Sequence, residues 1–259
     1  MNPSGRDVAV EGMLARAARL LDAFDETHRR LSLAVLVERS GLPRSTVHRT
    51  ASQLLALGWL DRRDGYYHVG DRLFEIASLA PTRVELRDLL LPFMQDLHEA
   101  TRLTVQLGIL DGTDVLLTEK ITGHHDIKIL SRVGSRLPAY ASSLGRAILA
   151  YSSAEVVEQV LEGPLEARTR YTITSPEKLR RELVAIPDRG WAVDREEGNI
   201  GISCVGAPVI DPRRGVVAAL SVTGPTARIK PDLLGPLLRI TSASASRALA
   251  GRSPTVRPG

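Results

Sequence analysis

Cysteine, aromatic residues and long apolar runs are all scarce in this sequence. One cysteine, Cys204, is present, so an internal disulfide and a cysteine-based zinc cluster are excluded. No stretch of eighteen or more apolar residues occurs, which argues against a membrane-spanning helix. Aromatic residues make up 4% of the chain, and the core must therefore be built from Leu, Val, Ile and Ala. Because no signal peptide precedes the first helix, we expect a soluble protein of the bacterial cytoplasm.

A large excess of one charge is also lacking. Residues 1–80 carry eleven Arg and ten Asp or Glu, a net charge of +1, and the remainder of the 259 residues carries 23 basic and 20 acidic residues, or +3. Neither part is a polycation, so binding to nucleic acid must depend on where the arginines lie. Every basic residue of the first 80 is arginine, which suits phosphate and guanine, although a high-GC genome enriches arginine too. The length is comfortable for two domains.

The strongest local pattern is a glycine turn between two short helices. The first helix is expected from Ser32, a good N-cap, to Ser40. Gly41 supplies the positive φ of the turn, and Pro43 suits the first position of the second helix. That second helix runs to about residue 57, and Gly58 ends it. Two helices joined in this way are typical of a helix-turn-helix.

The second of these helices has one apolar face and one face rich in hydrogen-bond donors. Val47, Ala51 and Leu54 fall on the apolar face at helical spacing. The expected DNA-contacting residues of the other face are Arg44, Ser45, Thr46, His48, Arg49 and Gln53. We expect Arg49 to contact guanine and the hydroxyls at the helix start to contact phosphate. The alternative is a merely solvated face of a general interaction domain.

A β-hairpin is expected directly after this helix. The runs 59–62 and 66–69 flank Asp64-Gly65, a dipeptide that favours a tight hairpin turn. A hairpin in this place completes a winged helix-turn-helix. Arg62 and Arg63 lie near its tip, where they are predicted to meet the DNA backbone or a minor groove.

The remainder of the sequence predicts an α+β domain. A short linker helix is expected at 72–79 and a longer one at 84–100. Further helices are expected at 143–150, 154–161, 176–189 and 231–249, and strands at 103–110, 115–120, 127–130, 204–210 and 216–222. The predicted domains are therefore 10–70 for DNA binding, 71–83 as a linker helix, and 84–250 for effector binding and oligomerisation. Antiparallel sheets of this kind cup small molecules on one face.

A serine pair introduces the helix expected at 143–150. Ser142 and Ser143 place two hydroxyls beside the free N–H groups of a helix start, an arrangement that suits the carboxylate of a small organic acid. The alternative is that these serines only cap the helix.

Signatures of enzymes and metal sites are absent from the sequence. Gly-x-Gly-x-x-Gly, Walker A and Gly-x-Ser-x-Gly patterns do not occur. His124 and His125 precede Asp126, but adjacent histidines on a strand point to opposite faces and cannot chelate together. We therefore expect no catalysis, no metal and no cofactor.

Three stretches carry a family resemblance. Residues 41–49 resemble the recognition-helix signature of the IclR family of bacterial transcriptional regulators. Residues 137–150 resemble the signature of that family's effector domain, as do 190–197 followed by 201–209. The matches occur in the family's order and span roughly residues 12–250.

The resemblance implies a winged helix-turn-helix followed by a GAF/PAS-like effector domain, a homodimer or dimer of dimers, operator DNA as partner and a small organic effector. The effector-site residues that it implies are Ile129, Ser143, Leu144, Asp194, Ile202, Cys204, Ser221 and Thr223. The spacing of these residues supports part of this set, because residues two apart on a strand point to the same face: Ile202 with Cys204, and Ser221 with Thr223. Because Leu144 and Ile202 are bulky and apolar, we expect an aromatic or branched ligand: an aromatic acid, or an amino acid or its biosynthetic intermediate. The alternative for Cys204 is a small buried apolar residue. The acidic run from Asp194 to Glu197 has a solvated loop as its alternative.

The function predicted from all of this is a small-molecule-responsive regulator of transcription, either a repressor or an activator. An architectural DNA-binding protein whose second domain only oligomerises is the alternative.

Overall fold

The computed structural model describes residues 12–251 apart from 26, 80, 125, 126, 128 and 130. The chain divides between Val84 and Glu85 into two compact units, which together give an α+β architecture. No helix in the described part of the chain has the length and apolar character needed to cross a lipid bilayer.

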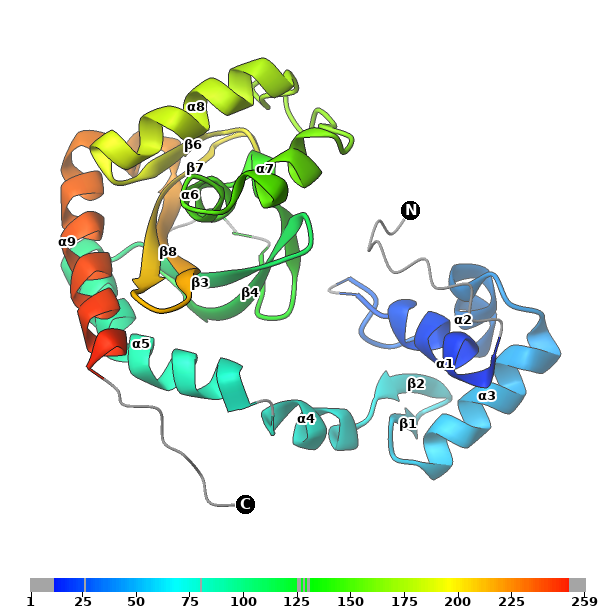
Figure 1. Ribbon diagram of the computed structural model, residues 1–259. Coiled ribbons are helices and arrows are strands. Elements are labelled where there is room, and N and C mark those ends of the chain that lie inside the picture. The colour runs from blue at the N-terminus through cyan, green and yellow to red at the C-terminus, as the bar shows by residue number, and fades with distance from the viewer. Residues whose placement is uncertain are drawn as a thin grey trace. The chain divides into compact units, whose positions relative to one another are not determined.

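The first unit is a three-helix bundle with a hairpin (Figure 1). Its elements are α1 (Met13–Asp22), α2 (Leu33–Ser40), α3 (Arg44–Ala56), β1 (Leu60–Arg63), β2 (Tyr66–Val69) and α4 (Asp71–Ser78). The Ser32 hydroxyl accepts the Val35 N–H and caps α2, and Gly41 ends it at φ 65°. The core comprises Leu20, Leu31, Leu36, Val47, Ala51, Leu54, Leu60 and Tyr67. The helix-turn-helix predicted from the glycine turn is thus confirmed.

Two local details of this unit follow from backbone geometry. Pro43 has φ −56° and ψ 142°, so its ψ is not helical, and it is the N-cap of α3, which begins one residue later than predicted. Asp64 and Gly65 both have positive φ, 51° and 81°, which is the tight turn that matches the twist of two paired strands. The wing is therefore a regular antiparallel hairpin with Arg62 opposite Tyr67.

The second unit is built on one six-stranded antiparallel sheet in the order β5-β4-β3-β8-β7-β6. Its strands are β3 (Thr104–Asp111), β4 (Asp114–Ile121), β5 (Arg136–Pro138), β6 (Ala192–Arg195), β7 (Ile202–Asp211) and β8 (Gly215–Pro225). Its helices are α5 (Pro81–Thr101), α6 (Ser143–Leu149), α7 (Ala154–Leu161), α8 (Pro176–Arg189) and α9 (Pro231–Ala250).

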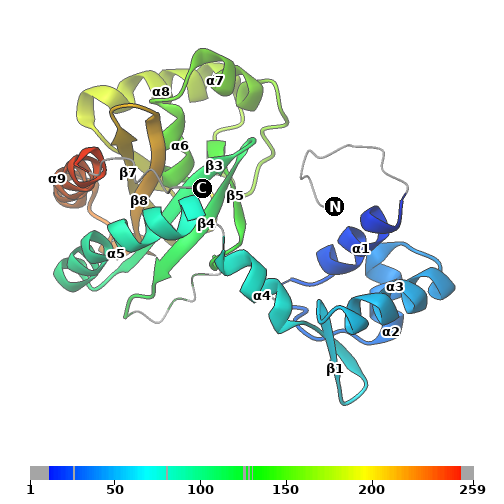
Figure 2. The ribbon, with the colours of Figure 1, turned by 60° about the horizontal axis from the view of Figure 1, so that its bottom comes forward.

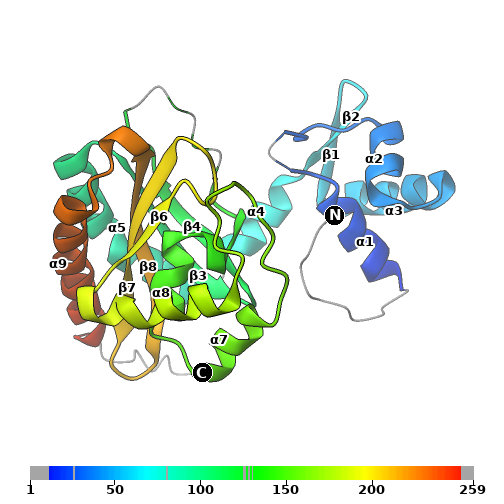
Figure 3. The same cartoon turned by 90° about the horizontal axis from the view of Figure 1, so that it is seen from above.

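Helices cover both faces of this sheet. α5 and α9 lie on one face, where Val105, Val205 and Val222 contact Met94 and Leu238 (Figure 3). The opposite face carries α6, with α7 and α8 packed outside it (Figure 2). The side chains of each strand alternate between these two layers, and Gln106, Ser221 and Thr223 form a hydrogen-bonded group on the α6 side.

Two edge strands were not predicted, and one predicted strand is wrong. β5 and β6 have three and four residues, too few to show an alternating pattern, and β5 ends in a proline that an edge strand tolerates. The predicted strand 127–130 is not one: its described residues, Ile127 and Ile129, are in irregular structure, and 128 and 130 lie outside the described residues.

A glycine permits the close approach of α6 to the sheet. A Cβ on Gly206 of β7 would lie 2.6 Å from the backbone oxygen of Ser143 and 3.1 Å from the Leu144 nitrogen. Backbone atoms held by a helix and a sheet cannot move aside cheaply, so only glycine fits at this position.

We predict that Gly206→Ala lowers the free energy of unfolding by about 1–3 kcal/mol, because α6 must shift away from β7. Gly163→Ala is the matched control, since its Cβ would meet its nearest neighbour at 3.4 Å. Urea unfolding of both variants measures the difference. Equal stabilities would show that α6 does not need this close approach.

Candidate functional site

The donor-rich face of α3 is open to solvent. Arg44, Ser45, His48, Arg49 and Gln53 are exposed, and Thr46 is half-buried, whereas the opposite face of the helix is buried. No acidic residue lies in the first turn of α3, where unsatisfied backbone N–H groups carry partial positive charge. The face is thus chemically suited to phosphates and to the edges of bases.

The two wing arginines differ in their surroundings. The Arg62 guanidinium lies over the Tyr67 ring, 5.4 Å from the ring centre, which holds the planar group in one orientation. Arg63 pairs with Asp61 across 3.0 Å and keeps about two thirds of its side chain exposed. Both side chains are exposed at the end of β1 and are therefore available for a contact with DNA.

The register of the sheet brings several of the predicted effector residues together. Asp194 on β6 lies opposite Cys204 on β7, and Cys204 lies opposite Thr223 on β8. Residues directly opposite on antiparallel strands share a face, so these three form a row that Ser221 joins two residues along β8. Asp194, Ser221 and Thr223 are buried, whereas Cys204 keeps intermediate exposure, so solvent-accessible space reaches this row.

The start of α6 meets this row. The Ser142 hydroxyl accepts the Gly145 N–H across 3.1 Å, so this serine has the capping role that the sequence offered as the alternative. The neighbouring Ser143 side chain lies near enough to the Cys204 thiol to lower its pKa. Ser143 is buried, and its backbone lies against Gly206. The hydroxyl of Ser143 and the row on the sheet therefore belong to one polar cluster.

The remaining predicted residues lie at the edges of this cluster. Ile202 shares the face of Cys204 and is buried. Leu144 belongs to the apolar layer between α6 and the sheet, close to Gly108, so its side chain packs in the core. Ile129 contributes its backbone oxygen, which accepts a hydrogen bond from Lys120 Nζ at 3.0 Å.

Sequence reasoning missed two polar residues of the same face. Gln106 lies opposite Ser221 and Lys120 in the sheet, is buried, and hydrogen-bonds the hydroxyls of Ser131, Ser221 and Thr223. Lys120 Nζ also donates to the Ser131 backbone oxygen. A polar residue at every second position of the strand, Thr104 and Gln106 between apolar neighbours, was the signal available in the sequence.

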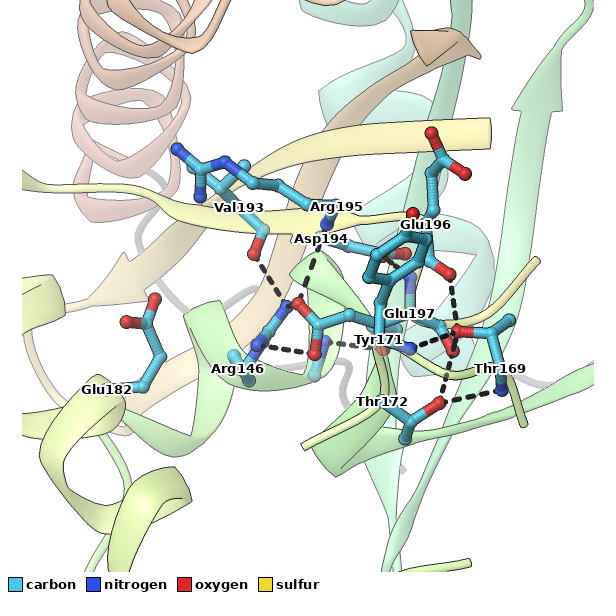
Figure 4. A network of polar contacts seen from close by, with 12 residues as sticks. Arg146, Thr169, Tyr171, Thr172, Glu182, Val193, Asp194, Arg195, Glu196 and Glu197 are labelled. Atoms are coloured by element: carbon cyan, nitrogen blue, oxygen red, sulfur yellow. Dashed lines mark hydrogen bonds and ion pairs between the residues drawn. The ribbon is translucent and has the colours of Figure 1, made fainter. Parts of the chain in front are cut away.

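The acidic run after β6 is not a solvated loop. Asp194 and Glu197 are both buried, and Glu197 forms a two-pronged ion pair with Arg146 of α6 (Figure 4). Arg146 is 1% exposed and also donates to the Val193 oxygen at 2.6 Å. The solvated loop considered for this run is therefore wrong for Asp194 and Glu197, which are buried, and the charge of Glu197 is paired inside the domain.

Burial controls ionisation in the cluster. Removal from water raises the pKa of Asp194 to about 6, although the nearby Arg146 guanidinium and two backbone N–H donors favour its charged form. Burial and the neighbouring carboxyl likewise raise the pKa of the Cys204 thiol well above its usual value. At neutral pH the cluster thus presents a thiol rather than a thiolate, and a carboxyl that is readily protonated.

Within the described ranges, no group of three or more His, Cys, Asp or Glu side chains is arranged to hold a metal ion. His125 and Asp126, which the sequence placed beside His124, lie outside the described residues.

Comparison with known proteins settles the family. The model of the IclR helix-turn-helix domain matches residues 13–64, and that of the bacterial transcriptional regulator IclR C-terminal domain matches residues 79–248. The chain belongs to the IclR family of bacterial transcriptional regulators. The resemblance inferred from three short stretches is thereby confirmed over most of the chain.

Relatives of this IclR-type chain match most of its length. It is 33% identical to the HTH-type transcriptional regulator KipR of Bacillus subtilis, over 79% of this chain and 82% of that protein. It is 30% identical to the transcriptional repressor IclR of Escherichia coli, over 85% of this chain and 82% of that protein. The chain is also similar to a crystal structure of an IclR homolog from Microbacterium hydrocarbonoxydans, complexed with 4-hydroxybenzoate. The TM-score is 0.85 and the sequence identity 31%, over 93% of this chain and 100% of that chain.

The raised pKa of Asp194 predicts a pH-dependent stability. The folded state holds the Asp194 proton up to about pH 6, whereas the unfolded chain releases it near pH 3.8, so the stabilisation is complete at low pH and is lost as pH rises through 6. We predict that this carboxyl alone lowers the free energy of unfolding by about 2 kcal/mol between pH 4.5 and 7.5.

Asp194→Asn should remove that part of the pH dependence. Urea unfolding gives the change in the free energy of unfolding between pH 4.5 and 7.5 for each protein. Comparing these two changes cancels any cost of the substitution that does not depend on pH. Parallel pH profiles for the two proteins would mean that Asp194 ionises normally.

Proposed function

We propose that this regulator binds operator DNA with the exposed face of α3 and the wing, and binds a small organic acid at the polar cluster of its C-terminal sheet. One observation carries the effector proposal: Ser143, Asp194, Cys204 and Thr223 converge from four elements, and accessible space reaches Cys204. Buried polar groups are costly in a core, whereas a ligand site needs a few of them in fixed positions. The complex of a relative with 4-hydroxybenzoate supports a carboxylate ligand.

The roles on DNA follow from chemistry and position. We assign to Arg49 a two-pronged contact with guanine, and to Ser45 and Thr46 contacts with phosphate at the start of α3. Arg44, His48 and Gln53 extend this face along the helix. Arg62 and Arg63 would contact the sugar-phosphate backbone or a minor groove beside it.

A homodimer is the proposed working unit. α4 contains no buried residue, and the side chains of Phe74 and Leu79 are 77% and 75% exposed. An apolar surface of this kind on a short helix indicates a protein contact. Pairing two copies would place two recognition helices on half-sites about one turn of DNA apart. A dimer of dimers, which the family resemblance implies, is the proposed higher assembly.

The proposed mechanism is a ligand-biased equilibrium. An effector that prefers one arrangement of the paired DNA-binding units shifts the population toward it, and by linkage the operator changes the effector affinity by the same factor. Because KipR and the repressor IclR are regulators, we infer that the effector is bound and released unchanged, in the cytoplasm where the operator lies.

Fluorescence anisotropy on the protein's own upstream DNA tests the proposal. Titrations are made at two salt concentrations, with and without pyruvate, benzoate, 4-hydroxybenzoate, phenylacetate and a set of amino acids. Preference for upstream over random DNA, shifted by one compound, is the expected result. Preference that no compound changes would favour an architectural protein, and equal binding to random DNA would overturn the operator claim.

Arg49→Ala should weaken operator binding by about 10- to 100-fold while binding to random DNA changes little, because a two-pronged guanine contact contributes mainly to discrimination. Anisotropy on both DNAs measures the ratio. Arg213→Ala, an exposed arginine in the turn after β7, removes the same charge and should leave that ratio unchanged. An unchanged ratio for Arg49→Ala would move the guanine contact elsewhere on α3.

Thr223→Val should weaken effector binding by about 3- to 10-fold and leave operator binding intact, because it removes a hydroxyl beside Cys204 while keeping the shape of the side chain. Calorimetric titration with the active acid measures the affinity. Thr241→Val on α9, whose hydroxyl donates to its own helix, is the matched control. Equal affinities for both variants would place the ligand away from β8.

A further inference from the structure

The network in Figure 4 contains two charged residues that the proposed effector site does not use. Arg146 Nη1 and Nη2 lie 3.0 and 2.7 Å from the two carboxylate oxygens of Glu197, with side chains 1% and 7% exposed. The pair joins residues 51 positions apart in the chain. Arg146 Nε is buried and has no hydrogen-bond partner among the described residues, which costs free energy. The guanidinium is therefore oriented toward Glu197 and Val193 although its Nε donor is left without a partner in the part of the chain that the structure describes.

This ion pair fixes the loop that carries Asp194. The Glu197 N–H donates to Asp194 Oδ1 across 2.8 Å, so the position of Glu197 helps to fix the orientation of the Asp194 carboxyl group. Hydroxyls of Thr169 and Thr172 hold the backbone oxygens of Glu196 and Glu197, each at 2.7 Å. The loop is therefore held by α6 on one side and by residues 169–172 on the other.

The groups around Asp194 come from three elements. α6 contributes Arg146, the loop after β6 contributes Glu197 with its own N–H and that of residue 198, and β7 contributes the Cys204 thiol. Burial raises the pKa of Asp194 to about 6, the Arg146 charge lowers it and the Glu197 charge raises it. A second carboxylate placed beside Asp194 would act as another negative charge, and two such groups in contact share one proton.

We propose that Arg146 and Glu197 are positioning residues that hold Asp194 at the effector site, where Asp194 in its acid form donates a hydrogen bond to the effector's carboxylate. The proposal rests on the proposed effector site and specifies how that site recognises its ligand. It commits to an anionic ligand: an effector that presented an ammonium group to Asp194 would require the ionised carboxylate instead.

Proton uptake on binding is the direct consequence. Only protonated protein is competent, so the apparent Kd rises as that fraction falls, by about 25-fold between pH 5.5 and 7.5 for a group that titrates near pH 6. Calorimetry with benzoate, 4-hydroxybenzoate, phenylacetate and pyruvate, in two buffers of different ionisation enthalpy at pH 7.5, counts the protons taken up. We expect nearly one per site for the acid that binds.

Asp194→Asn is the first variant, because its amide donates a hydrogen bond without a proton. It should bind the same acid at pH 7.5 at least as tightly as the wild type at pH 5.5, with no proton uptake and a flat pH profile. This comparison also removes any contribution from histidines, which titrate in the same range but remain in the variant.

Two further variants test the positioning pair through the sign of their effects. The Arg146 charge lowers the pKa of Asp194 more than the Glu197 charge raises it. The double variant Arg146→Met with Glu197→Leu removes both charges, so the pKa of Asp194, and with it the pH at which binding weakens, should move up. Glu197→Gln removes only the raising influence, so that pH should move down. Arg180→Met with Glu158→Leu, an exposed two-pronged pair between α8 and α7, should leave it unchanged. Circular dichroism checks that each variant is folded.

The outcomes separate this inference from the site on which it rests. If none of the four acids binds the wild type, the proposed effector site fails, and the inference fails with it. If an acid binds without proton uptake, or more tightly as pH rises, the site stands and the inference is overturned. If Asp194→Asn behaves as expected but neither Glu197 variant moves the pH profile, the pair is merely structural and the positioning claim is wrong.

Discussion

The buried ion pair between Arg146 and Glu197 constrains the rest of the effector unit. Moving two charges out of water costs several kcal/mol per ion, and only close, well-directed partners offset this. Both prongs of the pair and the bond to Val193 must therefore be present together, which fixes α6 against the end of β6. Because the polar cluster lies between those two elements, its geometry is set before any ligand arrives.

Alternate side chains of the strands point to opposite faces of the sheet, so the residues that pack against α5 and α9 differ from those of the polar cluster. On β3, Val105 and Leu107 point into the apolar layer under α5 and α9, whereas Thr104 and Gln106 point to the opposite side. The same holds for Val222 between Ser221 and Thr223. Substitutions on the polar side can therefore change the ligand without removing the contacts that hold the sheet to its helices.

Elements defined by local chemistry were predictable from sequence, whereas those defined by distant partners were not. The helix 154–161 and the helix that Ser175 caps have the expected bounds, because capping and helical periodicity are read within a few residues. β5 and β6 are edge strands that only their neighbours define.

The same distinction applies to the site. Cys204 and Thr223 were found through the family resemblance. Gln106 and the Arg146–Glu197 pair were missed because their roles arise from contacts 25 to 117 residues apart in the chain. An arginine in a helix and a glutamate in an acidic run look like surface residues until the fold brings them together, since charged residues are almost never buried unless they are paired.

The charge of the DNA-binding unit is consistent with the homodimer proposed for this regulator. The first 80 residues carry a net charge of only +1, so attraction to DNA comes from the few arginines aimed at it, of which Arg44, Arg49, Arg62 and Arg63 are the candidates. Because Arg49 is assigned to guanine, phosphate contacts from Arg44, Arg62 and Arg63 would correspond to a salt slope of roughly −3 for one copy, which gives weak binding at physiological salt. Two copies on adjacent half-sites double the contacts and the bases that are read. Modest local charge therefore keeps a single copy from binding tightly, and it makes operator affinity sensitive to how an effector arranges the pair.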